Sequence, residues 1–341
     1  QTAMAMENAD QQVLKQLTQW VLEGRPSWLC TVVKTWGSSP RPIGSLLACN
    51  SEGQIAGSLS GGCIEEDLLE KLQRGEMANA CPEVLVYGVS QAETERFGLP
   101  CGGQLHVVIE PFVDQHHLDT LQAITERIEQ RACIERTLDI ATGDMTLTET
   151  ERFRHLQFDG AFDNTPGKKT LHQTFGPRHQ LFLIGCGQVS QYLAEMAKAL
   201  DYQVVVCDPR ANLMAQWPVE GVQLITSYPD DAIRAQATDS FSAIIALTHD
   251  PRIDDMGLME ALTTDAYFIG AMGSTKTSEN RKARLKQLDI SDDLIARLHA
   301  PVGLPIGSKT PAEIAIAILA QLTALRSTAG NTVQADFRAV G

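Results

Sequence analysis

The second half of the chain alternates short apolar strands with helices in a regular rhythm. An apolar run at 180–184 leads into a Gly-rich turn and then into a helix that extends to Leu200. The later elements follow in alternation, with strands at 202–207, 222–226, 242–248 and 266–270 and helices near 230–236 and 254–262. Because successive parallel strands need a crossover connection, which a helix supplies, this rhythm predicts a doubly wound parallel sheet.

The turn after the first of these strands carries a dinucleotide-binding fingerprint. It reads Gly185-Cys-Gly187-Gln188-Val-Ser190, with serine where a third glycine or an alanine usually stands. The first glycine makes the turn, the second lets the backbone approach a phosphate, and the third position packs the helix on the strand. The sequence therefore predicts a Rossmann-like domain with C-terminal helices over 178–328.

Polar residues follow the later strands, at the edge where such sheets bind ligands. Asp208 ends the next strand, where an acidic residue bonds a ribose hydroxyl in this fold. Arg210 is a candidate for holding a phosphate, the alternative being a solvated loop residue. His249 is a candidate proton shuttle or ligand contact, the alternative being a structural hydrogen-bonding group. Because this fold serves many ligands, the fingerprint predicts the scaffold more firmly than it predicts bound NAD(P).

Two later features allow both a structural and a functional interpretation. Gly273 and Ser274 lead into a segment with five basic residues and one acidic residue between Lys276 and Lys286. This segment would either attract a phosphate or form the solvated face of a helix. Further along, the segment 310–313, Thr-Pro-Ala-Glu, predicts a capping box at the start of the last helix.

A Ser-Gly-Gly turn in the first half runs into an amphipathic helix predicted over 64–74. The turn contains Ser60, Gly61 and Gly62, and Cys63 stands at the helix start. Backbone N–H groups at a helix N-terminus bind anions, and the helix dipole favours a thiolate there. A tight turn with a buried cysteine is the alternative, because cysteine is commonly buried.

The rest of the first half predicts a mixed α+β domain over 1–113. The predicted elements are a helix near 10–22 and strands at 28–36, 45–49, 83–88 and 104–110. A second Gly-rich loop, 97–103, also carries a cysteine, and its candidate residues are Cys101, Gly102 and Gly103. Residues 114–177 form a connecting region with a weaker pattern. It predicts a helix near 116–131, strands around 134–140 and 151–158, and a linker at 163–169.

Composition excludes several classes of function. The chain has 28 basic and 42 acidic residues, for a net charge of −14, which argues against binding to nucleic acid or to an anionic membrane. No apolar run approaches the length of a membrane span, and no secretory signal pattern opens the chain. Its eight cysteines show neither a CxxC pair nor a zinc-binding spacing, so we expect a reduced cytoplasmic protein without a metal site of its own.

Taken in order, these segments resemble the XdhC/CoxI family of xanthine dehydrogenase accessory proteins. GSSPRPIG, GSLSGGCIEEDLL and CGGQLHVVIEP resemble the N-terminal block of that family. GCGQVSQYLA, VVVCDPR, LTHD, FIGAMGS and GLPIGSKTPAEIAIAI resemble its Rossmann block. The ordered set covers most of the chain and is far more specific than any one Gly-rich loop.

The resemblance implies a cofactor-maturation chaperone rather than a metabolic enzyme. Members bind the molybdenum cofactor, as molybdopterin or as molybdopterin dinucleotide, through Gly-rich loops. With a cysteine desulfurase they support its sulfuration, and they deliver it to a molybdenum hydroxylase such as xanthine dehydrogenase or aldehyde oxidoreductase. The resemblance also implies a homodimer. In this setting Cys63 and Cys101 would contact the cofactor's molybdenum or carry sulfur, a structural role for both being the alternative.

Two functions from other classes compete with this interpretation. An NAD(P)-dependent oxidoreductase would use the same Rossmann half, but the sequence supplies no clear proton donor paired with a substrate-binding arginine. A redox-sensing scaffold would use the cysteines and no cofactor at all.

Overall fold

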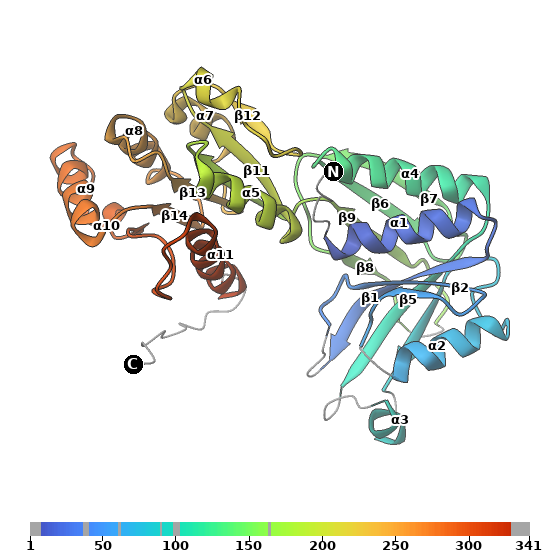
Figure 1. The fold of residues 1–341 in the computed structure, drawn as a ribbon. Helices are drawn as coiled ribbons and strands as arrows, with labels where there is room; N and C mark the ends of the chain where they lie inside the picture. Colours follow the sequence, from blue (N-terminus) through green and yellow to red (C-terminus); the bar gives the residue numbers. More distant parts are fainter. Residues whose placement is uncertain are drawn as a thin grey trace. The chain divides into compact units, whose positions relative to one another are not determined.

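The chain folds into two compact units. The first unit spans Glu7–Pro177, and the second begins at Arg178. The computed structural model describes residues 8–36, 41–60, 63–88, 91–97, 103–162 and 165–328 (Figure 1). The segment predicted as a linker, 163–169, lies within the first unit, between two strands of one sheet. Residues 114–177, expected as a connecting region, also belong to this unit.

The first unit contains a five-stranded antiparallel sheet in the order β3–β2–β1–β5–β4, which we call sheet A. Its strands are β1 (Ser27–Trp36), β2 (Leu46–Asn50), β3 (Ile55–Gly57), β4 (Glu83–Tyr87) and β5 (Gln104–Phe112). Helix α2 (Cys63–Gln73) covers one face, where Leu68 and Leu72 pack against alternate residues of β1 and β5. The short helix α3 (Gln91–Arg96) follows β4. The strands and the helix predicted in this region are confirmed within a residue or two.

The other face of sheet A packs on two helices and on a second sheet, sheet B. The helices are α1 (Ala9–Leu22) and α4 (Gln115–Glu129). Sheet B has the order β7–β6–β9–β8, with β6 (Cys133–Asp139), β7 (Met145–Thr150), β8 (Gln157–Asp159) and β9 (Thr170–Phe175). The strand predicted around 151–158 is wrong in position. β7 alternates half-buried Met145 and Leu147 with exposed threonines, but this alternation covers only two apolar residues and was missed.

A buried ion pair joins the two sheets. Arg136 of β6 donates from Nη1 and Nη2 to the two carboxylate oxygens of Glu110 on β5, at 2.8 and 2.6 Å. The Arg136 Nε also donates to the side-chain oxygen of Gln173 on β9, at 3.0 Å. Arg136 is 1% exposed and Glu110 is 2% exposed. Each charge therefore depends on the other, because neither can be hydrated in the folded state.

The second unit is a six-stranded parallel sheet in the order β12–β11–β10–β13–β14–β15. Its strands are β10 (His179–Ile184), β11 (Tyr202–Cys207), β12 (Gln223–Ile225), β13 (Ser242–Ala246), β14 (Phe268–Ala271) and β15 (Leu298–His299). Numbered along the chain, this is the 3-2-1-4-5-6 order of the dinucleotide-binding fold. The predicted Rossmann-like architecture is confirmed, although β15 was not predicted.

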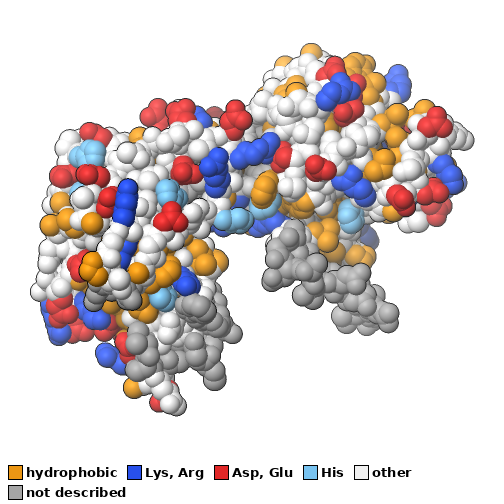
Figure 2. Space-filling model, turned by 180° about the vertical axis from the view of Figure 1, so that it is seen from behind, with side chains coloured by type: hydrophobic (Ala, Val, Ile, Leu, Met, Phe, Trp, Pro, Cys, Tyr) orange, Lys and Arg blue, Asp and Glu red, His pale blue; other side chains and the backbone are white. Residues whose placement is uncertain are grey.

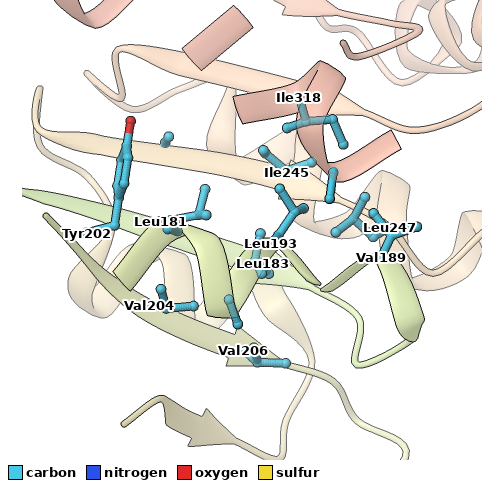
Figure 3. Close-up of a cluster of buried hydrophobic side chains, with 14 of the residues drawn as sticks. Leu181, Leu183, Val189, Leu193, Tyr202, Val204, Val206, Ile245, Leu247 and Ile318 are labelled. Atoms are coloured by element: carbon cyan, nitrogen blue, oxygen red, sulfur yellow. The ribbon is translucent and has the colours of Figure 1, made fainter. Parts of the chain in front are cut away.

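Helices cover both faces of this sheet. One face carries α5 (Gln188–Ala199), α6 (Ala211–Met214) and α11 (Pro311–Thr328). Figure 3 shows Leu193 of α5 and Ile318 of α11 gathered with Leu181, Leu183 and Ile245 of the central strands. The opposite face carries α7 (Pro229–Gln236), α8 (Pro251–Ala261), α9 (Thr275–Gln287) and α10 (Asp292–Ile295). The sequence offered a helix at α9 as one of two interpretations, and α10 was not predicted. Because the central strands are buried on both faces, their apolar runs are nearly continuous.

The last helix begins with the capping box expected from its motif, and the surface carries the many acidic side chains expected from composition. The predicted capping box is confirmed, since Thr310 Oγ1 accepts from the Glu313 N–H at 3.2 Å and Glu313 accepts from the Thr310 N–H at 2.9 Å. Asp and Glu side chains are scattered over the face seen in Figure 2, as the net charge of −14 leads one to expect. None of the helices in the described part of the chain combines the length and apolar character needed to cross a bilayer.

Candidate functional site

The strand ends of sheet A that lead into the motif-bearing segments of the first unit lie at one end of the sheet. β1 ends at Trp36 opposite Gln104, where β5 begins, and β4 ends nearby at Tyr87. β2 begins and β3 ends on this same side. The segments recognised from sequence, 37–44, 57–63 and 101–103, therefore enter or leave the sheet on one side. Of the predicted site residues in these segments, Gly61, Gly62, Cys101 and Gly102 lie outside the described residues, while Gly103 is buried just before β5.

The turn before α2 holds a carboxylate from its own chain. Glu65 Oε1 accepts from the backbone N–H groups of Leu59 and Ser60, both at 2.8 Å. The Ser60 hydroxyl donates to Glu65 Oε2 at 2.9 Å. The described part of this turn is thus an anion cradle, as its sequence suggests, but its anion is Glu65. The predicted ligand-binding donors of Ser60 are turned toward that carboxylate.

Exposure separates Cys63 from most other cysteines of the chain. Cys63 is exposed at the first residue of α2, whereas Cys30, Cys49, Cys133, Cys186 and Cys207 are buried. Burial raises the pKa of both Cys186 and Cys207 to about 11, so both are protonated thiols at neutral pH. Cys63 is therefore the exposed thiol, among those that the structure describes, that borders a loop predicted as a site. The other exposed thiol, Cys81, lies away from these motifs.

His106 stands on β5 near the same loops, on the face of sheet A that meets sheet B. A register shift between Val32 and Lys34 brings Lys34 opposite His106. The ring of Phe162 stands edge-on to the imidazole, with centroids 4.8 Å apart, and lies 4.7 Å from the Lys34 ammonium. His106 is 7% exposed, and neither ring nitrogen has a hydrogen-bond partner among the residues that the structure describes. Burial, and then the charge of Lys34, lower the pKa of His106, so the folded protein holds it neutral.

This neutral imidazole predicts a pH dependence of stability. As the pH falls below about 6.5, the unfolded chain takes up a proton at this residue and the folded chain does not, so stability decreases toward acid. We expect the free energy of unfolding of the His106→Leu variant to fall less steeply between pH 7 and pH 5 than that of the wild type. Urea denaturation across this range measures both slopes. His155→Gln, which removes an exposed histidine, is the matched control. Identical slopes for the wild type and His106→Leu would refute the assignment.

The carboxyl ends of the parallel strands bring the predicted residues of the second unit to one edge. Strand β10 lies between β11 and β13, so the turns after these strands flank the point where the strand order reverses. Ligands bind at this switch point in doubly wound sheets. The predicted residues at this edge are Gly185, Gly187, Gln188, Asp208, Arg210, His249, Gly273 and Ser274.

The two glycines of the first turn have different roles. Gly185 has φ +111°, and a Cβ at this residue would stand 2.9 Å from Thr248 Cγ2. A Cβ on Gly187 would instead meet no atom of the described residues within 4 Å. Gly187 is the N-cap of α5, and no side chain caps this helix. The start of this helix is thus exposed at Gly187 and Gln188 and carries no side-chain cap, and an uncapped helix start is the arrangement that binds phosphate in this fold. The serine in the third position is explained by its hydroxyl, because Ser190 Oγ donates to the Gly185 carbonyl at 2.6 Å.

Asp208 is bound to its neighbours rather than presented to a ligand. Its oxygens accept from Arg210 Nε at 2.9 Å and Nη2 at 2.7 Å, and from the Cys186 N–H at 3.2 Å. Burial alone would raise the pKa of Asp208, but the hydrogen bonds from Arg210 hold it below its usual range. The carboxylate expected to bond a ribose hydroxyl thus supports the loop and fixes a partly exposed Arg210 at the sheet edge.

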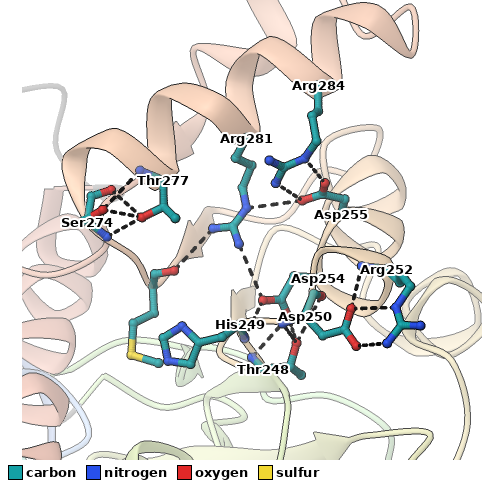
Figure 4. Close-up of polar contacts among 11 residues, drawn as sticks. Thr248, His249, Asp250, Arg252, Asp254, Asp255, Ser274, Thr277, Arg281 and Arg284 are labelled. Carbon is teal, nitrogen blue, oxygen red and sulfur yellow. Dashed lines mark hydrogen bonds and ion pairs between the residues drawn. The ribbon is translucent and has the colours of Figure 1, made fainter.

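The turn after β13 presents His249. Its side chain is exposed, and its backbone has φ +66°, which is uncommon for a non-glycine residue. Asp250, the next residue, caps α8 by accepting from the Arg252 N–H at 3.0 Å. Figure 4 shows the imidazole of His249 beside the turn and directed away from α8. The structure therefore places a solvent-accessible imidazole at the same edge as Gly187 and Arg210.

Two arginines of the basic segment after β14 are held by acidic residues of α8. Arg281 Nε lies 3.3 Å from Asp255 Oδ1, and Arg284 Nε lies 2.8 Å from Asp255 Oδ2. The N-terminus of α9 is also satisfied, because Ser274 accepts from the Thr277 N–H at 3.1 Å and donates its own N–H to Thr277 Oγ1 at 2.7 Å. The segment forms a helix, as the alternative expected, but Arg281 is buried in it rather than on a solvated face. Asp254 and Asp255 could have indicated these ion pairs, because acidic residues on an otherwise apolar helix face need buried partners.

Two protein-family models match segments of this chain that contain candidate site residues. A model described as the XdhC Rossmann domain matches residues 181–322, and one described as the XdhC and CoxI family matches residues 20–88. The chain belongs to the XdhC/CoxI family. The first match includes every predicted site residue of the second unit, and the XdhC/CoxI match in the first unit includes Ser60 and Cys63.

Several relatives align with the chain over most of its length. The chain is 25% identical to a probable xanthine dehydrogenase subunit of Bacillus subtilis, with 87% of this chain and 92% of the relative covered. It is 23% identical to the "Molybdenum cofactor insertion chaperone PaoD" of Escherichia coli, with 92% and 88% covered. A crystal structure described as a xanthine dehydrogenase from Bacillus halodurans is 24% identical and shares the fold, with a TM-score of 0.64 and 95% and 98% covered.

Proposed function

We propose that this chain binds the molybdenum cofactor and inserts it into a molybdenum enzyme that it helps to mature. The observation that carries the proposal is the uncapped N-terminus of α5 at the switch point, with the space beside Gly187 open. It lies within the match to the XdhC Rossmann domain, and a relative aligned over most of the chain is named a molybdenum cofactor insertion chaperone.

The chemistry of the cofactor fits the residues at this edge. Molybdopterin carries a phosphate and its dinucleotide form carries a pyrophosphate, and either group suits a helix N-terminus. We infer that the N–H groups following Gly187 and the guanidinium of Arg210 hold this anion, with His249 as a further contact. Arg210 suits this role because Asp208 fixes its position while leaving it partly exposed. Gln188, at the exposed first position of α5, would border the same ligand.

The first unit supplies a candidate for sulfur chemistry. Cys63 is exposed at the start of a helix, where a thiolate is favoured. A thiolate suits both sulfur exchange and contact with a late transition metal. We infer that Cys63 supports sulfuration of the cofactor together with a cysteine desulfurase, and the same role is proposed for Cys101. The client would be a molybdenum hydroxylase of the xanthine dehydrogenase or aldehyde oxidoreductase type, and the acting form a homodimer.

The geometry of Asp208 disfavours the rival oxidoreductase. An NAD-binding Rossmann domain offers the carboxylate after its second strand to the ribose hydroxyls. Here Arg210 and the Cys186 N–H occupy that carboxylate.

Cofactor content of the purified protein tests the proposal. After co-expression with the molybdenum-cofactor biosynthesis proteins and anaerobic purification, the denatured and oxidised sample should show pterin fluorescence approaching one equivalent per chain. Mass spectrometry of the released compound then distinguishes molybdopterin from its dinucleotide form. A Rossmann protein from another family, prepared in parallel, sets the background. Pterin at the background level, or bound NAD(P) in its place, would refute the proposal.

A further inference from the structure

The turn after β13, which carries Thr248 and His249, is held by the side chain of Asp254. Asp254, on α8, accepts from the Thr248 N–H at 3.2 Å and from the Thr248 hydroxyl at 2.6 Å, both at Oδ1. Its Oδ2 accepts from the His249 N–H at 3.1 Å. Asp254 is completely buried, so this carboxylate has exchanged water for these donors. Figure 4 shows the three residues converging below α9.

The conformation that Asp254 holds is an unfavourable one. A left-handed backbone costs a non-glycine residue about 1–2 kcal/mol, and it persists only where the surroundings impose it. The His249 imidazole does not offset this cost, because it makes no hydrogen bond to any residue that the structure describes. A strained, exposed side chain without a structural partner is typical of a functional residue. The bonds from Asp254 are what impose the conformation here.

The same carboxylate reaches the turn after the next strand. Arg281 of α9 lies with Nη2 3.5 Å from Asp254 Oδ2, and its Nη1 donates to the Met272 carbonyl at 3.3 Å. Met272 immediately precedes Gly273 and Ser274. One buried ion pair therefore links the backbone after β13 to the backbone after β14, and the two turns cannot shift independently.

We propose that Asp254 is a positioning residue of the cofactor site, which sets the backbone of His249 and, through Arg281, holds the two neighbouring turns in one geometry. The inference rests on the proposed function for what the edge binds, but the role of Asp254 in fixing the turn does not depend on it. The ligand class follows from the edge itself: an anionic, phosphate-bearing cofactor approached by Arg210 and His249.

A matched pair of substitutions on α8 tests this role. Asp254→Asn and Asp255→Asn each remove one carboxylate that faces Arg281, but only Asp254 contacts the His249 turn. We expect Asp254→Asn to speed amide exchange at Thr248 and His249 by about tenfold or more and to weaken molybdopterin binding by a similar factor. Asp255→Asn should leave both quantities within about twofold. Thr248→Val keeps the side-chain shape and removes the hydroxyl, which donates to Asp254 and accepts from the Asp250 N–H. It should change both quantities in the same direction if Asp254→Asn folds poorly.

A double-mutant cycle separates positioning from general stabilisation. Glycine adopts the left-handed conformation without help, so His249→Gly removes both the imidazole and the need for Asp254. Adding Asp254→Asn to His249→Gly should therefore cost less affinity than Asp254→Asn costs in the wild type, and any remaining loss reports the link through Arg281. Equal effects of Asp254→Asn and Asp255→Asn on exchange, or a full further loss in the double variant, would overturn the proposal. If the wild type binds no molybdopterin, the proposed function fails, while the exchange comparison still decides whether Asp254 fixes the turn.

Discussion

Replacing Arg136 by methionine is expected to lower the free energy of unfolding of the first unit by about 3–5 kcal/mol. Methionine fills much of the same volume, so the loss arises from charge rather than from a cavity. Glu110 would remain 2% exposed with its counter-ion gone, and Gln173 would lose the donor to its side-chain oxygen. Urea denaturation followed by tryptophan fluorescence measures the effect, since Trp20, Trp28 and Trp36 all belong to this unit.

The double variant Arg136→Met/Glu110→Leu is the control for this interpretation. It removes both charges together, and replacing a buried ion pair by apolar side chains of similar volume is often neutral or stabilising. We expect it to recover most of the stability lost in Arg136→Met. If Arg136→Met costs less than about 1 kcal/mol, or if the double variant is worse than the single one, the pair is not the buried connection between sheets A and B described above.

Replacing Gly185 by alanine is expected to destabilise the second unit by about 2–5 kcal/mol. Two costs combine: a backbone with φ +111°, and a Cβ that would stand 2.9 Å from Thr248 Cγ2 and 3.2 Å from the Thr248 N. Strain and overpacking each contribute about 1–3 kcal/mol at such positions. Calorimetry of the intact protein, with Trp217 fluorescence to identify the transition of this unit, measures the change.

Gly187→Ala provides the comparison two residues away. Its Cβ would enter open space from a backbone with φ −75°, so the cost should stay below about 1 kcal/mol, mainly from a poorer N-cap. Equal destabilisation by Gly185→Ala and Gly187→Ala would contradict the distinction between a glycine required by the fold and a glycine required by a ligand.

The architecture of the second unit was predictable because its signals are local. Strands buried on both faces give continuous apolar runs, and the Gly-rich turn identifies the first crossover. The first unit was predicted less completely. Sheet A alternates clearly, but β7 and β8 of sheet B are short and bury no residue fully, so the alternation within 145–159 involves few apolar residues. The ion pair between Arg136 and Glu110 could not be predicted either, because it depends on which faces of two strands distant in sequence pack together.

The site shows the same division between local and tertiary information. The sequence indicated which turns follow the strands, because glycine and serine clusters are typical of turns. It did not show that Glu65 already occupies the turn before α2, or that Arg210 already occupies Asp208. Asp254 was missed for a related reason. Its donors lie in the preceding turn, and a carboxylate within an apolar helix face reveals its partners only in three dimensions.

Cofactor affinity of a Gly187→Asp variant tests the central claim most directly, namely that the uncapped start of α5 binds the anionic end of the molybdenum cofactor. Aspartate is a favourable N-cap, so the variant should be as stable as the wild type or more so. Its carboxylate would stand where the phosphate is proposed to bind, and Gly187→Asn supplies the same cap without the charge. The account predicts that the Kd for molybdopterin rises at least about tenfold in Gly187→Asp relative to Gly187→Asn, with unchanged Tm. Wild-type affinity in a stable Gly187→Asp protein would contradict it.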